Sequence, residues 1–353
     1  MIRHLSIILS ACLLQTAFAE QIAPDDSRIS YRGVLYPQVS TTHAEFLRFP
    51  PELLKEASPA THGFNPAKAR FTAGASIHFQ AKAPEITLQF EPEKFCKVSV
   101  FQNGTFDSIY PLKKDGSLTI KSKSPGQAVD FSIILPNFRN PLFKGISLQD
   151  GSLIKALPDS RSKTYVAIGD SITHGQGQDF AYQTWGGQVA DKLGMNFYNL
   201  AVGGSNANAH LAKPTLELDH IELITILWGY NDWVHKGKSP EKFANDLTSA
   251  IKVIRSKHKD TPIVVLGMLN TLTETSKRTG EQYKADQFRK AAQALVHQLK
   301  SAGDQHIHFV DCLDMIDEKT DLRDKVHLSE KGATKLASKI TPILKDILSQ
   351  SKK

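Results

Sequence analysis

The spacing of apolar residues changes near residue 163, and this change limits the folds that the chain can adopt. Before it, apolar and polar residues alternate, as in 76–81 (SIHFQA) and 85–91 (EITLQFE), and turn pairs such as Asn103-Gly104 separate the runs. Short alternating runs with such turns are typical of antiparallel sheets. We therefore predict an all-β sandwich or jelly roll over residues 20–155.

After residue 163, short apolar runs alternate with segments of helical period. The apolar runs are 165–168, 197–200, 223–227, 263–268 and 307–310. One of the intervening segments repeats apolar residues on a single helix face, at Phe243, Leu247, Ile251 and Ile254. Five strands alternating with helices predict an α/β domain over 164–353, built on a doubly wound parallel sheet. Residues 156–163 (ALPDSRSK) are the expected linker.

Residues 1–19 have the features of a secretory signal peptide. Arg3 forms a short basic region, residues 5–14 are apolar but too few to span a membrane, and 17–19 (AFA) fits a cleavage site. Cys12 lies in a lipoprotein-like box, but apolar residues follow it where a lipoprotein would turn polar. We expect an exported protein, periplasmic or extracellular, with no other segment apolar enough to cross a membrane.

The formal net charge is +7, from 43 basic and 36 acidic residues. The lysines are scattered among acidic residues and form no basic block with interleaved aromatic residues, so we expect no nucleic-acid partner. A mildly basic surface suits an acidic polysaccharide, although solubility explains it equally well.

Cys96 and Cys312 are the cysteines beyond residue 19, and we expect two buried free thiols rather than a bridge. The oligomeric state is not determined by these features.

Polar or glycine residues follow four of the predicted strands. Ser171 follows the first strand, Gly204 the second, Asn231 the third and His327 the last. Ligands of such sheets bind beyond the carboxyl ends of the strands. These four residues are therefore expected to meet at one site.

A serine hydroxyl becomes an effective nucleophile when a base takes its proton. His327 is the candidate base, and Asp324 is placed to accept its Nδ1 proton and stabilise the imidazolium, with Asp321 as second choice. Attack on an ester creates an oxyanion that needs preorganised donors. The N–H groups of Ser171 and Gly204 and the amide of Asn231 could supply three.

Four blocks, in order along the chain, resemble the SGNH or GDSL hydrolases. They are GDSITHG (169–175), NLAVGGS (199–205), WGYND (228–232) and DKVH (324–327). The resemblance covers about residues 163–348 and implies a flavodoxin-like SGNH fold that hydrolyses esters without a metal or other cofactor. It also implies a catalytic triad of Ser171, Asp324 and His327, and an oxyanion hole formed by Ser171, Gly204 and Asn231.

The order of the two predicted domains resembles bacterial carbohydrate esterases of family 2, which remove acetyl groups from polysaccharides. The stretch 134–151 (ILPNFRNPLFKGISLQDG), which leads into the linker, adds to this resemblance. Some of those enzymes lack the triad acid, whereas this chain offers Asp324. The resemblance implies an exported esterase of acetylated carbohydrates, with the front domain orienting the glycan. A lipid esterase or thioesterase, an O-acetyltransferase and a non-catalytic glycan-binding protein are the alternatives; the sugar and the acetylated position are not determined.

Two further interpretations concern the chemistry. Ser205 lies in a near match to the nucleophile elbow G-x-S-x-G, but Ala207 replaces the last glycine, so Ser171 is preferred. His306 and His308 alternate on a strand and could begin a zinc site, but no third ligand is near them in the sequence.

Other residues near the blocks are expected to assist. We expect His174 at the rim of the site. His174, Trp228 and Trp233 are the substrate-binding candidates, with Trp233 offering a flat face to a sugar ring. Asp170 and Asp232 are expected to brace loops through hydrogen bonds.

Overall fold

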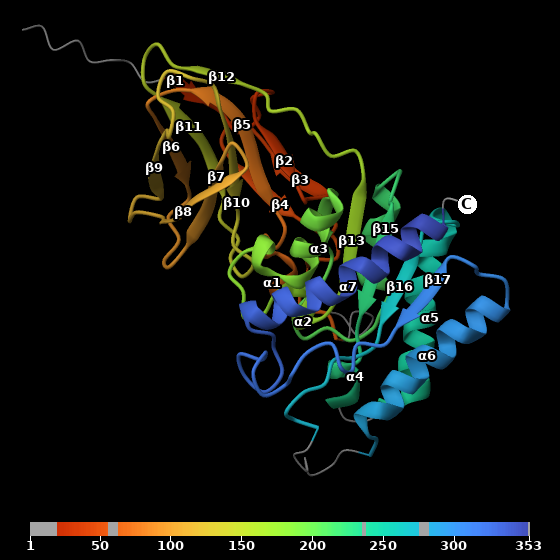
Figure 1. Ribbon diagram of the computed structural model, residues 1–353. Coiled ribbons are helices and arrows are strands. Elements are labelled where there is room, and N and C mark those ends of the chain that lie inside the picture. Colours follow the sequence, from red (N-terminus) through yellow and green to blue (C-terminus); the bar gives the residue numbers. More distant parts are fainter. Residues whose placement is uncertain (1–19, 56–62, 235–237, 275–281, 352–353) are drawn as a thin grey trace, which may run out of the picture.

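The structure is a computed structural model that describes residues 20–55, 63–234, 238–274 and 282–351 (Figure 1). The predicted signal peptide and Cys12 lie outside these ranges. Among the helices of the described residues, none combines the length and the apolar composition needed to cross a membrane. Cys96 and Cys312 are both buried and free, as predicted.

Two antiparallel sheets form a β-sandwich in the front part of the chain, which confirms the predicted all-β region; its jelly-roll connectivity stays a prediction. One sheet has the order β3-β4-β11-β6-β9 with β1 beside β11, and the other has the order β12-β5-β10-β7-β8 with β2 beside β5. The strands are β1 Glu20–Ile22, β2 Ser30–Arg32, β3 Tyr36–Val39, β4 Ala44–Leu47, β5 Ser76–Lys82, β6 Glu85–Phe90, β7 Lys97–Gln102, β8 Thr105–Pro111, β9 Ser117–Lys121, β10 Val129–Ile134, β11 Phe143–Leu148 and β12 Leu153–Lys155.

The alternation in the sequence appears as two faces on each sandwich strand. Every second residue of β6 and of β10 is buried, so one face of each strand lies in the core. Phe79 and Phe131 are partners in the β5–β10 ladder, and their rings stack 5.4 Å apart in that core.

A parallel five-stranded sheet follows, with the order β14-β13-β15-β16-β17. This order and the helices on both faces confirm the doubly wound fold, and the direction of winding reverses between β13 and β15. Its strands are β13 Thr164–Gly169, β14 Asn196–Asn199, β15 Leu223–Leu227, β16 Ile263–Leu266 and β17 Ile307–Val310. The helices of this part are α2 Ser171–His174, α3 Trp185–Leu193, α4 Tyr230–Val234, α5 Pro240–Lys257, α6 Ala285–Ser301 and α7 Glu330–Gln350.

Helices cover both faces of the parallel sheet (Figure 1). In β13, Tyr165 and Ala167 face a core shared with α3 and α7, whereas Val166 and Ile168 face a core shared with α5 and α6. Burial on both faces explains why this strand reads as a continuous apolar run rather than an alternating one.

Some residues of the front part (residues 20–155) pack in the core of the parallel sheet rather than in the sandwich. Leu47, Phe49, Phe64 and other residues between 47 and 69 belong to the cluster that fills one face of the parallel sheet. This segment includes the short helix α1 (Pro66–Ala69). The type of sheet therefore changes after residue 155, but the packing of the two parts is continuous.

Arg48 connects the two parts through a fully buried side chain that is 1% exposed. Its guanidinium donates to five backbone carbonyls, those of Phe71 (2.7 Å), Asn199 (2.6 Å), Ala201 (2.8 Å), Lys68 (3.3 Å) and Ala69 (3.4 Å). Burial lowers the pKa of Arg48 to about 9, which still leaves the group charged at neutral pH. The acceptors come from residues 68–71 and 199–201, so the charge is satisfied only when the two parts are docked.

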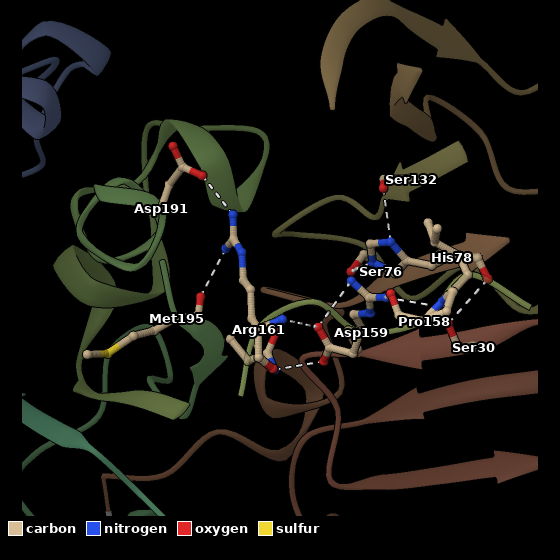
Figure 2. Close-up of polar contacts among 12 residues, drawn as sticks. Ser30, Ser76, His78, Ser132, Pro158, Asp159, Arg161, Asp191 and Met195 are labelled. Atoms are coloured by element: carbon tan, nitrogen blue, oxygen red, sulfur yellow. Dashed lines mark hydrogen bonds and ion pairs between the residues drawn. The ribbon is translucent and has the colours of Figure 1, made fainter. Parts of the chain in front are cut away.

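The linker is also held in place (Figure 2). Arg161 donates to the carbonyl of Met195 at 2.9 Å and to the carboxylate of Asp191 at 2.8 Å. Asp159 accepts a hydrogen bond from the Asn196 amide at 2.7 Å, and Arg32 donates to the carbonyl of Pro158 at 3.2 Å. The linker is therefore bonded to both parts and is not a free tether.

Replacing Arg48 by Met should lower the free energy of unfolding by about 3 kcal/mol or more, because several buried carbonyls lose their donor. Denaturant unfolding followed by circular dichroism measures the change. The matched control is Arg28→Met, since Arg28 forms ion pairs only at the sandwich surface, where a pair contributes less than about 1 kcal/mol. Equal losses in the two variants would contradict a special role for Arg48.

Candidate active site

Ser171 lies where β13 ends and α2 begins. The carboxylate of Asp170 caps this short helix by accepting the N–H of Ile172 at 3.0 Å. Gly175 ends the helix with φ +102°, and a Cβ there would lie 2.5 Å from Thr184 Cγ2. The chain therefore turns sharply around Ser171 and places its side chain at the carboxyl edge of the sheet.

Ser171, His327 and Asp324 form a continuous chain of hydrogen bonds. Ser171 Oγ lies 2.9 Å from His327 Nε2, and His327 Nδ1 lies 2.8 Å from Asp324 Oδ2. The second carboxylate oxygen of Asp324 accepts the N–H groups of Val326 (2.7 Å) and His327 (2.8 Å). Partial burial opposes ionisation, but these N–H groups and the imidazole hold the pKa of Asp324 below its ordinary value. An ionised carboxylate so placed fixes the imidazole tautomer that can take a proton from serine.

Asp321, the second choice as orienting acid, binds groups other than the imidazole. It is fully buried, and it binds Lys335 Nζ at 2.7 Å and the N–H of Asp317 at 2.8 Å. Lys335 lies on α7, so Asp321 ties that helix to the loop carrying His327.

Three hydrogen-bond donors lie on the segments around Ser171. Gly204 has φ +85°, and the N–H groups of Ser171 and Gly204 have no acceptor among the described residues. The Asn231 amide donates one N–H to the carbonyl of Ser205 at 3.0 Å, which orients the group and leaves its second N–H available. This arrangement suits an oxyanion, which needs fixed donors that are not already bonded.

Asp170 and Asp232 brace the loops, as the sequence predicts. Asp232 is fully buried, accepts the N–H of Ala207 at 3.2 Å and pairs with Lys238 Nζ. Burial raises the pKa of Asp170 to about 7, and the nearby Asp232 carboxylate adds to the rise.

Ser205 does not act as the alternative nucleophile in this arrangement. Its side chain is fully buried, and its hydroxyl donates to the carbonyl of Gly169 at 3.2 Å. His327 is bonded instead to Ser171. Ser205 holds the loop after β14 against the end of β13.

The prediction that His174 lies at the rim of the site is wrong. The ring is 0% exposed, with Nε2 2.9 Å from the carbonyl of Asn137 and Nδ1 accepting the N–H of Gly203 at 3.0 Å. It also stacks on Phe138 with 4.7 Å between ring centroids. Burial, with a contribution from Arg48, lowers the pKa of His174 well below its ordinary value, so the ring is neutral.

The substrate-binding prediction for Trp228 and Trp233 is also wrong. Trp228 is 3% exposed and Trp233 is 6% exposed, and both pack in the core between the sheet and α5 and α6. The indole N–H of Trp233 donates to the carbonyl of Tyr283 at 2.9 Å. Neither ring offers a face to a sugar.

His306 and His308 have no third metal ligand near them among the described residues. His306 lies 3.8 Å from Asp260 in an exposed pair. Within the part of the chain that the structure describes, no group of three or more His, Cys, Asp or Glu side chains is placed to hold a metal ion.

Three residues that position the glycine block, defined here as residues 199–205, were not predicted from the sequence: Asn199, Arg48 and Asn137. Asn199 donates to the carbonyl of Thr173 at 3.1 Å and accepts the N–H of Ala201 at 3.0 Å. Arg48 and Asn137 reach the same region from the front part. Asn199 is the first residue of one of the four sequence blocks, and that position was a signal for its role. No motif in the sequence around Arg48 or Asn137 indicates theirs.

Comparisons with known proteins concern the family and the fold. The profile of the GDSL-like Lipase/Acylhydrolase family matches residues 167–335. No curated protein sequence matches the chain.

Several solved structures share the two-part fold. The salicylyl-acyltransferase SsfX3 from a tetracycline biosynthetic pathway is similar at 20% identity and TM-score 0.77, over 91% of this chain and 95% of its own. A family two carbohydrate esterase from Cellvibrio japonicus is similar at 15% identity and TM-score 0.66, over 94% and 99%. An acetyl xylan esterase from Butyrivibrio proteoclasticus is similar at 14% identity, with the same TM-score and coverage. At these identities the likeness concerns the fold.

Asp324→Asn should lower kcat on an aryl acetate more than a hundredfold, because the amide no longer stabilises the imidazolium. Asp321→Asn is the control, and it should cost stability through Lys335 while changing kcat far less. Steady-state kinetics and thermal unfolding separate the two effects. A larger loss of kcat in Asp321→Asn would reverse the assignment.

Asn231→Ala should lower kcat by roughly a hundred- to a thousandfold, the usual effect of losing one oxyanion donor. Asn196→Ala serves as control, since the Asn196 amide bonds only to the linker. If kcat on an aryl acetate is the same in the wild type and in Asn231→Ala, Asn231 has no part in the hole.

Proposed function

Because residues 167–335 make up a GDSL/SGNH hydrolase domain, we propose that the protein is an exported serine esterase that removes O-acetyl groups from a carbohydrate. The observation that carries this proposal is the hydrogen-bonded chain from Ser171 through His327 to Asp324, next to backbone donors that have no acceptor in the part of the chain that the structure describes.

Acylation begins when Ser171 Oγ attacks the acetyl carbonyl carbon. His327 Nε2 takes the hydroxyl proton, and Asp324 stabilises the imidazolium that results. The N–H groups of Ser171 and Gly204 and the amide of Asn231 donate hydrogen bonds to the carbonyl oxygen and stabilise its negative charge. The ester bond to the sugar then breaks, and His327 gives its proton to the sugar oxygen, leaving an acetylated serine.

Deacylation repeats these steps with water. His327 Nε2 removes a proton from the water as its oxygen attacks the acetyl carbon. The bond to Ser171 Oγ breaks, the proton returns to that oxygen, and acetate leaves. The 2.9 Å hydrogen bond between His327 and Ser171 allows the same imidazole to serve as base and acid in both halves.

The carbohydrate substrate is supported by the two-part fold, which the chain shares with the family two carbohydrate esterase and the acetyl xylan esterase. In this proposal the sandwich supplies binding energy from parts of the glycan remote from the ester. Export is proposed from the signal-peptide features of residues 1–19.

Acyl transfer is the second candidate function. The likeness to the salicylyl-acyltransferase over 91% of this chain favours it. The acyl-enzyme would be the same, but a hydroxyl of a second molecule would replace water as the acceptor.

A screen for acetate release tests the proposal. Acetylated xylan, acetylated oligosaccharides and aryl esters of two to ten acyl carbons are incubated with the wild type and with Ser171→Ala. We expect acetate from at least one glycan, none with Ser171→Ala, and kcat/KM at least about tenfold higher for acetyl than for decanoyl esters. Better turnover of decanoyl esters would indicate a lipid substrate. Acylated acceptor without free acetate would indicate a transferase, and binding of glycans without any turnover would reject the esterase.

A further inference from the structure

Lys68 brings a positive charge from the front part of the chain to the candidate active site. It lies on α1, in the segment whose apolar residues pack on the parallel sheet, where the two parts of the fold meet (Figure 1). The four sequence blocks all follow residue 163, so no block contains it.

The glycines of the glycine block show how close Lys68 comes. A Cβ placed on Gly203 would lie 3.5 Å from Lys68 Cδ and 3.7 Å from Ser171 Cβ. A Cβ placed on Gly204 would lie 3.7 Å from Lys68 Nζ, and apart from the chain neighbours of Gly204 no other atom of the described residues lies within 4 Å of it. The lysine chain therefore runs over Gly203 beside the serine, and its ammonium ends over Gly204, a candidate oxyanion donor.

The backbone of Lys68 is fixed in this position. Its N–H donates to the side chain of Asn65 at 3.1 Å, which caps α1, and its carbonyl accepts from Arg48 at 3.3 Å. Arg48 also donates to the carbonyls of Asn199 and Ala201. One guanidinium therefore holds both the backbone of Lys68 and the start of the glycine block in place. The ammonium itself has no acceptor among the described residues.

Basic side chains flank the acid of the triad. Asp324 is the acid nearest to His327, and both of its oxygens are already bonded. Arg323 and Lys325 flank it and are exposed, and neither forms an ion pair with a described residue. A side chain that brings an unneutralised charge next to a reaction centre favours a substrate of opposite charge.

We propose that Lys68 determines specificity by binding a carboxylate that the substrate carries close to its acetyl ester. This inference rests on the proposed esterase function and narrows its substrate to acetylated glycans that contain acidic sugars. A hydrogen bond between an ammonium and a carboxylate is charge-assisted and stronger than a neutral one. Its loss corresponds to roughly a ten- to hundredfold change in relative kcat/KM.

Matched esters that differ by one charge test the proposal. The probes are 3- and 4-acetoxybenzoate, each compared with its neutral methyl ester, and kcat/KM is measured for the wild type, Lys68→Gln and Lys68→Glu. For at least one isomer, the ratio of anionic to neutral kcat/KM should fall about tenfold or more in Lys68→Gln and further in Lys68→Glu. Lys82→Gln, an exposed lysine at the end of β5, is the control and should keep the wild-type ratio.

Two outcomes would overturn the proposal. If Lys68→Gln lowers kcat/KM equally for both members of each pair, the charge serves the oxyanion of any ester rather than a substrate carboxylate. If the ratio stays at the wild-type value in both Lys68 variants, the ammonium contacts no substrate group. Thermal unfolding of each variant shows that a change in ratio does not come from a partly unfolded protein.

A binding measurement separates this proposal from the esterase function. Ser171→Ala cannot turn over, so calorimetry with 3- and 4-acetoxybenzoate measures binding without hydrolysis, and the difference between variants with and without Lys68 reports the carboxylate contact. If the anion binds about tenfold or more weakly to the Ser171→Ala, Lys68→Gln double variant than to Ser171→Ala, the result supports a carboxylate-binding site at Lys68. This holds even if the wild type releases no acetate. Equal binding by the single and double variants rejects it even if the wild type is an active esterase.

A polymer comparison tests whether the carboxylate belongs to a sugar. Acetate release from acetylated polygalacturonate should fall at least about tenfold further in Lys68→Gln than release from acetylated xylan backbone without acidic sugars. Equal losses on both polymers would overturn the assignment to acidic glycans.

Discussion

The placement of the candidate active site depends on the burial of one guanidinium. Removing a charged group from water is costly unless its surroundings replace the lost hydrogen bonds. Arg48 meets this requirement with carbonyls from residues 68–71 on one side and from residues 199–201 on the other. Because neither set alone satisfies the charge, docking of the sandwich and shaping of the glycine block are a single event. The sandwich is therefore part of the catalytic fold as well as a candidate glycan-binding surface.

A second contact from the front part acts on the same block. The carbonyl of Asn137 fixes the tautomer of His174, whose other nitrogen then accepts the N–H of Gly203. The N–H of the neighbouring Gly204 has no acceptor among the described residues. From the other side, Asn231 binds the carbonyl of Ser205 and Asp232 binds the N–H of Ala207. Donors held in this way need not reorganise when negative charge develops, which is the physical basis of an oxyanion hole.

Local chemistry explains which site residues could be anticipated. Asp324 and His327 are three residues apart on one turn, and the backbone of that turn bonds to the carboxylate, so their pairing follows from spacing. His174, Trp228 and Trp233 lie in or beside the same blocks and were expected to face a substrate. Each is covered by a segment distant in the sequence, such as Phe138 over His174 and the carbonyl of Tyr283 at Trp233. The neighbouring sequence of a polar or aromatic loop residue does not show whether its side chain faces the substrate or is buried by a distant segment.

The amino-acid sequence alone was enough to predict the two sheet types, the order of strands and helices, and the loops that carry Ser171, Gly204, Asn231 and His327. These follow from apolar periodicity and from the rule that parallel strands end at one edge, both of which act over short stretches of chain. The tertiary structure was needed to show that Arg48 and Lys68 of the front part reach the glycine block, and that Asn137 acts on it through His174. Such contacts join residues more than a hundred positions apart in the case of Arg48 and Asn199, and they exist only because two hydrophobic surfaces exclude water between the sandwich and the parallel sheet.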